Sequence, residues 1–193
     1  MSNEHDLGPI PREMGGMPLG RSAMWWVIAS EVVIFGALVA CFLLYKWRHP
    51  EWSEMAAMTS STLGAVNTTI LLTSSFFVVM AHDYATRGDR KNVALFMGLT
   101  ILCGFGFLTV KSIEYATEIS HGFTMSSHLF WSFYFCLTGL HGLHVIAGMI
   151  ALAWVTFAAE RGQQMHRIEL AGLYWHFVDL VWIFLFPLLY IAK

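Results

Sequence analysis

Hydrophobic residues along the chain gather into five long stretches that are separated by short polar segments. The stretches span residues 24–47, 63–82, 93–119, 128–159 and 172–192. Each is long enough to cross a bilayer as a helix, which requires about 20 predominantly apolar residues. The pattern predicts an all-α integral membrane bundle of five transmembrane helices.

The composition supports a membrane protein and leaves little chain for a soluble domain. Of the 193 residues, 56% are hydrophobic and 12% are charged, whereas about 25% are charged in an average soluble domain. The net charge of -2, without a dense Lys/Arg run, gives no reason to expect nucleic acid as a partner. The three cysteines lie in apolar stretches without CxxC spacing, which argues against a disulfide framework or a zinc site.

Residues 1–22 are polar and rich in Gly and Pro, so they predict a flexible tail ahead of a transmembrane domain over residues 23–193. Nothing in the tail resembles the apolar core of a secretory signal. The basic residues divide unequally between the two sides of the membrane, with Arg12, Arg21, Arg87, Arg90, Lys91, Arg161 and Arg167 on one side and Lys46, Arg48 and Lys193 on the other. The positive-inside rule then predicts a cytoplasmic amino terminus and a periplasmic carboxyl terminus.

Two carboxylates, Glu31 and Asp179, fall in the cytoplasmic half of an apolar stretch, where ionisable residues are rare and often functional. Glu31 and Asp179 each come seven residues into a stretch, which predicts a depth on the order of 10 Å from the cytoplasmic boundary. For Glu31 two interpretations stay open: a proton-handling or subunit-contact site, or a protonated acid that is hydrogen-bonded to a neighbouring helix. For Asp179, the presence of His176 three residues earlier on the same helical face favours a local polar pair.

A third polar pair is predicted near the outer surface. Lys111 and Glu114 come late in the third stretch and are three residues apart, so their side chains can meet on one helical face. A lysine at this depth can extend its ammonium group to the interface. We therefore expect a structural pair on the outer side.

Histidines in a helical bundle raise the alternative of a haem-binding membrane anchor. A haem with two histidine ligands needs them on facing helices at one depth, but His141 and His144 lie on the same helix and neither has an obvious partner. His82 and His176 are closer in depth, yet each is near an interface. The spacing favours packing histidines with hydrogen bonds over haem ligands.

The chain resembles subunit III of the haem-copper terminal oxidases over everything after the tail. The resemblance is carried by motifs in consecutive helices: Ser30-Glu31 with Phe35, Asn67-Thr68 with Leu71-Leu72, Ala81-His82, Gly88-Asp89-Arg90-Lys91, Glu114-Tyr115, Thr138-Gly139 with His141-Gly142 and His144-Val145, and Tyr174-Trp175-His176-Phe177-Val178-Asp179 with Val181-Trp182. The chain is similar to the shorter bacterial members, which lack the first two of seven helices.

The resemblance implies a subunit that has no redox centre and packs beside the large subunit I, with subunit II nearby and the haems and copper held by these partners. No catalytic, cofactor-binding or metal-binding residue is expected here. Glu31, His144, His176 and Asp179 are implied to form the polar interior, concerned with protons or with subunit contact. The family also implies bound phospholipid and support of the large subunit's stability and proton uptake in aerobic respiration.

These expectations place the protein in the bacterial cytoplasmic membrane as an accessory subunit of a proton-pumping oxygen reductase. The electron donor implied is cytochrome c, with a quinol oxidase or a protein associated with nitric oxide reductase as alternatives. Membership of a larger respiratory supercomplex stays open. An independent haem-binding anchor is the alternative from a different functional class.

Overall fold

The computed structural model describes residues 13–14, 17–160 and 167–191. Five long helices make up the bundle, namely α1 (Leu19–Arg48), α3 (Ser61–Thr86), α4 (Arg90–Ser120), α5 (Leu129–Glu160) and α6 (Arg167–Phe186). A short helix, α2 (Trp52–Met58), connects α1 to α3, and a π-helical turn, η1 (Pro187–Ile191), continues α6. All five spanning segments are long and apolar enough to cross a membrane, which confirms the predicted fold class.

The helices extend beyond the apolar stretches at several ends, because polar residues continue the helical backbone outside the hydrophobic window. Helix α1 begins at Leu19, inside the segment expected to be a tail. Two strands of two residues each, β1 (Glu13–Met14) and β2 (Met17–Pro18), pair antiparallel just before it and were not anticipated. Residues 1–12 lie outside the described part of the chain, so their flexibility stays a prediction.

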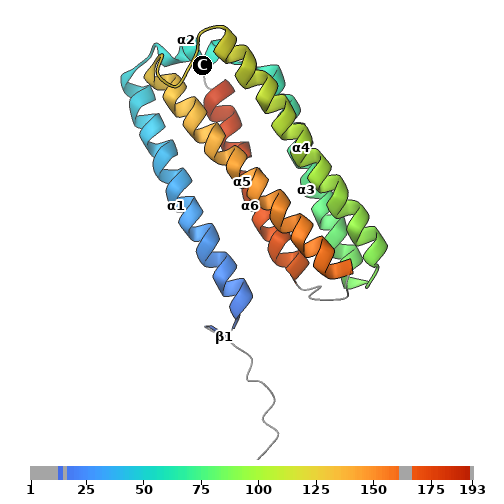
Figure 1. The fold of residues 1–193 in the computed structure, drawn as a ribbon. Helices are drawn as coiled ribbons and strands as arrows, with labels where there is room; N and C mark the ends of the chain where they lie inside the picture. Colours follow the sequence, from blue (N-terminus) through green and yellow to red (C-terminus); the bar gives the residue numbers. More distant parts are fainter. Residues whose placement is uncertain (1–12, 15–16, 161–166, 192–193) are drawn as a thin grey trace, which may run out of the picture.

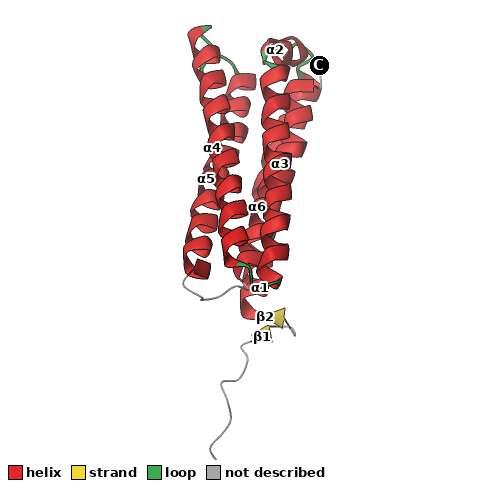
Figure 2. Cartoon of the chain, turned by 90° about the vertical axis from the view of Figure 1, so that its right-hand side faces the viewer, coloured by secondary structure: helices red, strands yellow, loops and turns green. Residues whose placement is uncertain are grey.

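The helices run along one common axis, and the described connections are confined to its two ends (Figure 2). We call the end at which α1 begins the lower end, and the end that carries α2 and η1 the upper end (Figure 1). Helix α6 lies at the centre of the bundle. In its most apolar 18-residue segment 50% of the residues are buried, compared with 17% in the corresponding segment of α1. Helix α1 therefore lies at the periphery of the bundle, where it contacts α5 and α6.

Local signals set two of the helix starts. The chain turns between α3 and α4 at Gly88, whose φ of 74° is accessible to glycine without steric cost. Asp89 then caps α4, because its carboxylate accepts hydrogen bonds from the Asn92 backbone N–H at 3.2 Å and the Asn92 amide at 2.6 Å. These bonds hold the pKa of Asp89 below its usual value. Ser60 caps α3 in the same way, with its hydroxyl oxygen accepting from the Leu63 N–H.

Two tryptophans of α6 attach the central helix to α3. The indole N–H of Trp175 donates to Ser74 at 3.0 Å, and that of Trp182 donates to Thr68 at the same distance. Both tryptophans are fully buried. The hydroxyl-rich sequence of α3 thus supplies acceptors for buried indoles, which is the helix-contact chemistry expected of small polar residues in a membrane bundle.

Candidate functional site

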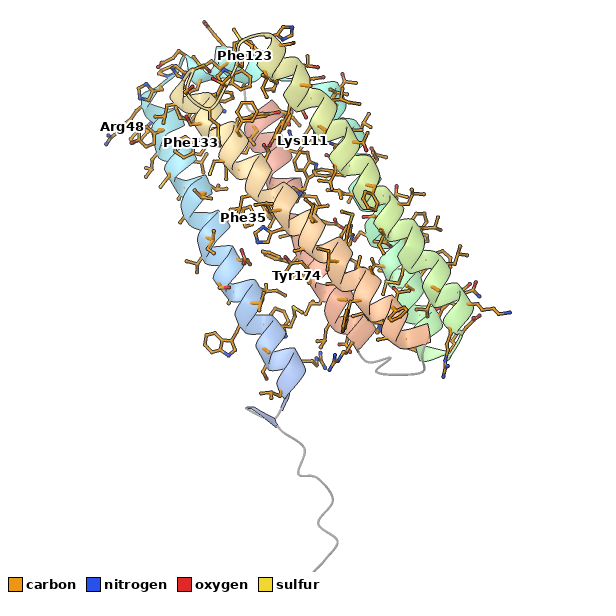
Figure 3. The ribbon with its side chains drawn as sticks, in the orientation of Figure 1. Phe35, Arg48, Lys111, Phe123, Phe133 and Tyr174 are labelled. Atoms are coloured by element: carbon orange, nitrogen blue, oxygen red, sulfur yellow. The ribbon has the colours of Figure 1, made fainter. Side chains whose placement is uncertain are left out.

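The polar interior contains a hydrogen-bonded pair of a carboxyl group and an imidazole that joins α1 to α5. The Oε2 atom of Glu31 lies 2.9 Å from Nε2 of His144, and both side chains are largely buried. The other ring nitrogen of His144 lies 2.8 Å from the carbonyl oxygen of Leu140, so it carries a proton and donates to that carbonyl. The Nε2–Oε2 contact therefore holds one further proton, either on the imidazole or on the carboxyl group. Phe35, which Figure 3 shows between α1 and α5, packs its ring edge against His144 at 5.2 Å.

This pair joins two residues that the resemblance places in the polar interior. Glu31 lies twelve residues beyond Leu19, the first residue of α1, and its depth from the cytoplasmic boundary stays a prediction. The group that meets His144 is this carboxyl group and not a second histidine. Both ring nitrogens of His144 are engaged, which leaves neither for a haem iron.

We expect Glu31→Gln to preserve assembly, because a carboxamide can keep a hydrogen bond to His144 while it cannot hold an exchangeable acid proton. Glu31→Leu is the matched comparison, since it leaves a buried imidazole nitrogen without a partner at a cost of about 1–3 kcal/mol. Thermal unfolding of the purified complex measures stability, and proton uptake during turnover measures function. Loss of assembly in Glu31→Gln would contradict this interpretation.

The predicted pair of His176 and Asp179 does not form directly. Nδ1 of His176 instead lies 2.6 Å from the hydroxyl of Ser75 on α3. Asp179 is 3% exposed, and neither of its carboxylate oxygens has a hydrogen-bond partner within the described residues. The helical spacing places both residues on one face of α6 as expected, but the polar contact of that face is made to α3.

The predicted pair of Lys111 and Glu114 forms at 3.0 Å, yet the lysine does not extend to the interface. Only 5% of the Lys111 side chain and 1% of the Glu114 side chain are exposed, and Figure 3 shows Lys111 in the upper half of the bundle. The Lys111 ammonium group also donates to the hydroxyls of Tyr134 and Tyr190. The Tyr134 hydroxyl donates in turn to the second oxygen of Glu114 at 2.8 Å. The pair is thus the centre of a buried polar cluster that joins α4, α5 and η1.

Sequence reasoning missed the partners of these residues. Tyr134 and Tyr190 complete the Lys111 cluster, Ser75 binds His176, and Glu118 is buried one turn after Glu114 with one oxygen unpartnered in the described part of the chain. Because Glu118 follows Glu114 by four residues, both lie on one helical face, and this spacing could have predicted that Glu118 is near the Lys111–Glu114 pair. His141 packs against the rings of Phe107 and Trp182, as expected of a packing histidine. The expected hydrogen bonds are missing, since neither ring nitrogen has a partner among the described residues.

Two hollows of about 230 Å³ each lie between α1 and α6. The lower pocket, at the lower end, is shared with α3 and includes Arg21, Trp25, His82, Glu169 and His176 in its lining. The apolar groove lies above it and is lined only by apolar residues of α1 and α6. The arrangement offers polar contacts at the lower end and hydrocarbon contacts toward the middle.

The described residues contain no group of three or more His, Cys, Asp or Glu side chains that could hold a metal ion. Several titratable groups inside the bundle form pairs or short contacts, namely Glu31 with His144, Lys111 with Glu114, and His176 with Ser75. Such contacts can hold or pass protons and can join helices. Asp179 and His141 have no hydrogen-bond partner in the described part of the chain.

Comparison with known proteins identifies the family. The model of the family described as cytochrome c oxidase subunit III matches residues 15–193. The chain belongs to this family. The protein is therefore a subunit III of a haem-copper oxidase, of the cytochrome c or quinol type.

Similar proteins come from several lineages. The chain is 31% identical to a cytochrome c oxidase subunit 3 of Thermostichus vulcanus, over 85% of this chain and 83% of that protein. It is 33% identical to a quinol oxidase subunit 3 of Bacillus subtilis, over 86% and 84% of the two chains. It is also 30% identical to a haem-copper oxidase subunit I+III of Aeropyrum pernix, over 89% of this chain and 22% of that longer protein.

Proposed function

We propose that this chain is a non-catalytic third subunit that packs against subunit I of a proton-pumping oxygen reductase and supports its stability and proton uptake. The match to the family over residues 15–193 carries the proposal. The relative in which subunits I and III form one polypeptide supports a partnership with subunit I. The buried Glu31–His144 pair supports a role in handling protons, because it holds one shared proton within the membrane-spanning region.

The proposed orientation places the lower end in the cytoplasm and the upper end in the periplasm of a bacterial cell. The described basic residues support it, since Arg21, Arg87, Arg90, Lys91 and Arg167 all belong to elements at the lower end. At the upper end, Lys46 and Arg48 end α1. The bias toward the lower end follows the positive-inside rule.

The two hollows between α1 and α6 support the proposal of a bound phospholipid. Arg21 at the mouth of the lower pocket is about half exposed and lies 3.5 Å from Glu169, so its guanidinium group can also reach a lipid phosphate. The apolar groove continues upward between Phe35 and Val39 of α1 and Phe177 and Val181 of α6, where an acyl chain fits. A lipid in this position would occupy the two hollows between α1 and α6 and so join α1 to the rest of the bundle.

Purification of the chain from its native membrane in mild detergent, followed by mass spectrometry of everything that accompanies it, tests these proposals. We expect a large haem-copper subunit I, together with subunit II and retained phospholipid. A copper-binding domain in subunit II indicates cytochrome c as the electron donor, and its absence indicates quinol. Recovery of the chain alone, with bound haem, would overturn the proposal in favour of an independent membrane anchor. Additional respiratory complexes in the same sample would establish a supercomplex.

A further inference from the structure

A third hollow, of about 340 Å³, lies at the upper end of the bundle, where α2 meets the connection between α4 and α5. We call this space the upper pocket. Figure 3 shows Phe123 at this end, and its ring stacks on Trp131 at 4.5 Å, so that both rings line the pocket. The lining also contains two thioethers and two imidazoles, from Met55, Met58, His121 and His128. Soft sulfur donors and imidazole nitrogens therefore border one small space.

The two methionines are placed to act together. Met55 and Met58 are three residues apart on α2, so their side chains lie on one face of that helix. Met55 is half-buried, and Met58 is 56% exposed. A methionine side chain is unbranched and has three rotatable bonds, so its sulfur atom can adjust its position to a partner. Helix α2 thus presents a pair of adaptable thioethers to the upper pocket.

The two histidines differ in the nitrogen atoms that they have available. His121 is the C-cap residue of α4 and is exposed, with its ring edge-on to Phe123 at 6.3 Å. His128 uses Nδ1 to accept a hydrogen bond from the backbone N–H of Phe130 at 3.2 Å, so its own proton is on Nε2. A neutral imidazole in this state has no free lone pair for a metal ion. His121 is therefore the available imidazole ligand.

The end of α4 favours a cation beside His121. Glu118 precedes His121 by three residues on the same helical face and is 3% exposed. One of its carboxyl oxygens has no hydrogen-bond partner within the described residues. The partial negative charge at the carboxyl end of a helix adds to this preference. Glu118 can also orient the imidazole, because a metal-bound histidine usually donates its other N–H to a carboxylate, a carbonyl oxygen or water.

We propose that Met55, Met58 and His121 bind one Cu(I) ion in the upper pocket. Thioethers are soft ligands that select Cu(I), and imidazole also suits copper, whereas Mg²⁺ and Ca²⁺ prefer oxygen ligands. His, Cys, Asp and Glu side chains alone form no metal site in the described part of the chain, so methionine sulfur is the donor that completes this one. The site departs from the expectation that the chain has no metal-binding residue. It does not rest on the proposed function, because all three ligands belong to this chain.

Titration with Cu(I) in the absence of oxygen tests the site in the protein purified from its native membrane with everything that accompanies it. Bicinchoninate, a chelator that is coloured when it binds Cu(I), competes for the ion, and the copper content of the untreated sample is subtracted. We expect one additional equivalent of bound Cu(I) in the native protein. His121→Ala, and the double variant of Met55→Leu with Met58→Leu, should each lose it. Glu118→Gln should bind the ion about 10-fold more weakly, as expected for a group that orients a metal ligand.

Met125→Leu is the matched control, because Met125 is also 56% exposed at the upper end but does not line the upper pocket. Replacement of methionine by leucine nearly conserves side-chain volume, so each of these variants should fold, and helical circular dichroism checks that it does. Met125→Leu should bind Cu(I) as the native protein does. The proposal would be overturned if the native protein bound no additional equivalent, if the double variant still bound it, or if Met125→Leu lost it.

Discussion

Glu114→Leu is expected to lower the stability of the folded chain by about 3–5 kcal/mol, because it leaves the buried Lys111 ammonium group without its anionic partner. Lys111 lies 3.0 Å from Glu114, and almost none of either side chain is exposed. The remaining contacts of the ammonium group are the hydroxyls of Tyr134 and Tyr190 and nearby aromatic rings. These contacts reduce the penalty of an unpaired buried charge but do not neutralise it. Unfolding of the purified protein in detergent, followed by helical circular dichroism, measures the change.

The double variant Lys111→Met with Glu114→Leu provides the matched control. Replacing a whole buried ion pair with apolar side chains of similar volume is often close to neutral, and the Tyr134 and Tyr190 hydroxyls lie 3.2 Å apart and can bind each other. We therefore expect the double variant to recover most of the stability that Glu114→Leu loses. A loss below about 1 kcal/mol in the single variant would show that the pair behaves like an exposed one.

The Lys111 cluster shows which part of the site was accessible from the sequence. A spacing of three residues on one helix predicted that Lys111 and Glu114 meet, and they do. Their burial depends on Tyr134, 23 residues from Lys111 along the chain, and on Tyr190, 79 residues away. Local periodicity contains no information on such distant neighbours, so the sequence could not distinguish a buried pair from one that reaches the interface.

The same limit explains the contact between Glu31 and His144. The apolar stretches located all five spanning helices, and both residues were identified as candidates for the polar interior. Their pairing joins positions 113 residues apart along the chain and depends on how α1 packs against α5. The periodicity within one helix contains no information on that packing.

The sequence gives no reason to distinguish Ser75 from Ser74, because both are small hydroxyl residues suited to helix contact. Its neighbour Ser74 has that role, since it accepts the indole N–H of Trp175. Ser75 contacts the His176 imidazole instead. Adjacent residues on a helix differ in direction by about 100°, so two serines in succession can have unrelated roles that only the packing of α3 against α6 distinguishes.

Gly148→Ala is expected to destabilise the bundle by about 1–3 kcal/mol through overpacking. A Cβ atom at this position of α5 would lie 2.8 Å from the Trp175 ring. The ring cannot retreat easily, because Trp175 is fully buried and its indole N–H is held by Ser74. Thermal unfolding of the purified protein measures the loss, and near-ultraviolet circular dichroism reports any displacement of the indole.

Two further glycines separate overpacking from the general effect of adding a methyl group to a helix. Gly98 of α4 has no atom within 4 Å of an added Cβ, so Gly98→Ala should be neutral or slightly stabilising because alanine favours helix. At Gly104 the added Cβ would approach the Met149 sulfur at 2.6 Å, and this flexible side chain can adopt another rotamer. The expected order of destabilisation is Gly148, then Gly104, then Gly98. Equal effects at Gly148 and Gly98 would show that Trp175 is free to move, and that α5 and α6 are packed less tightly than this contact requires.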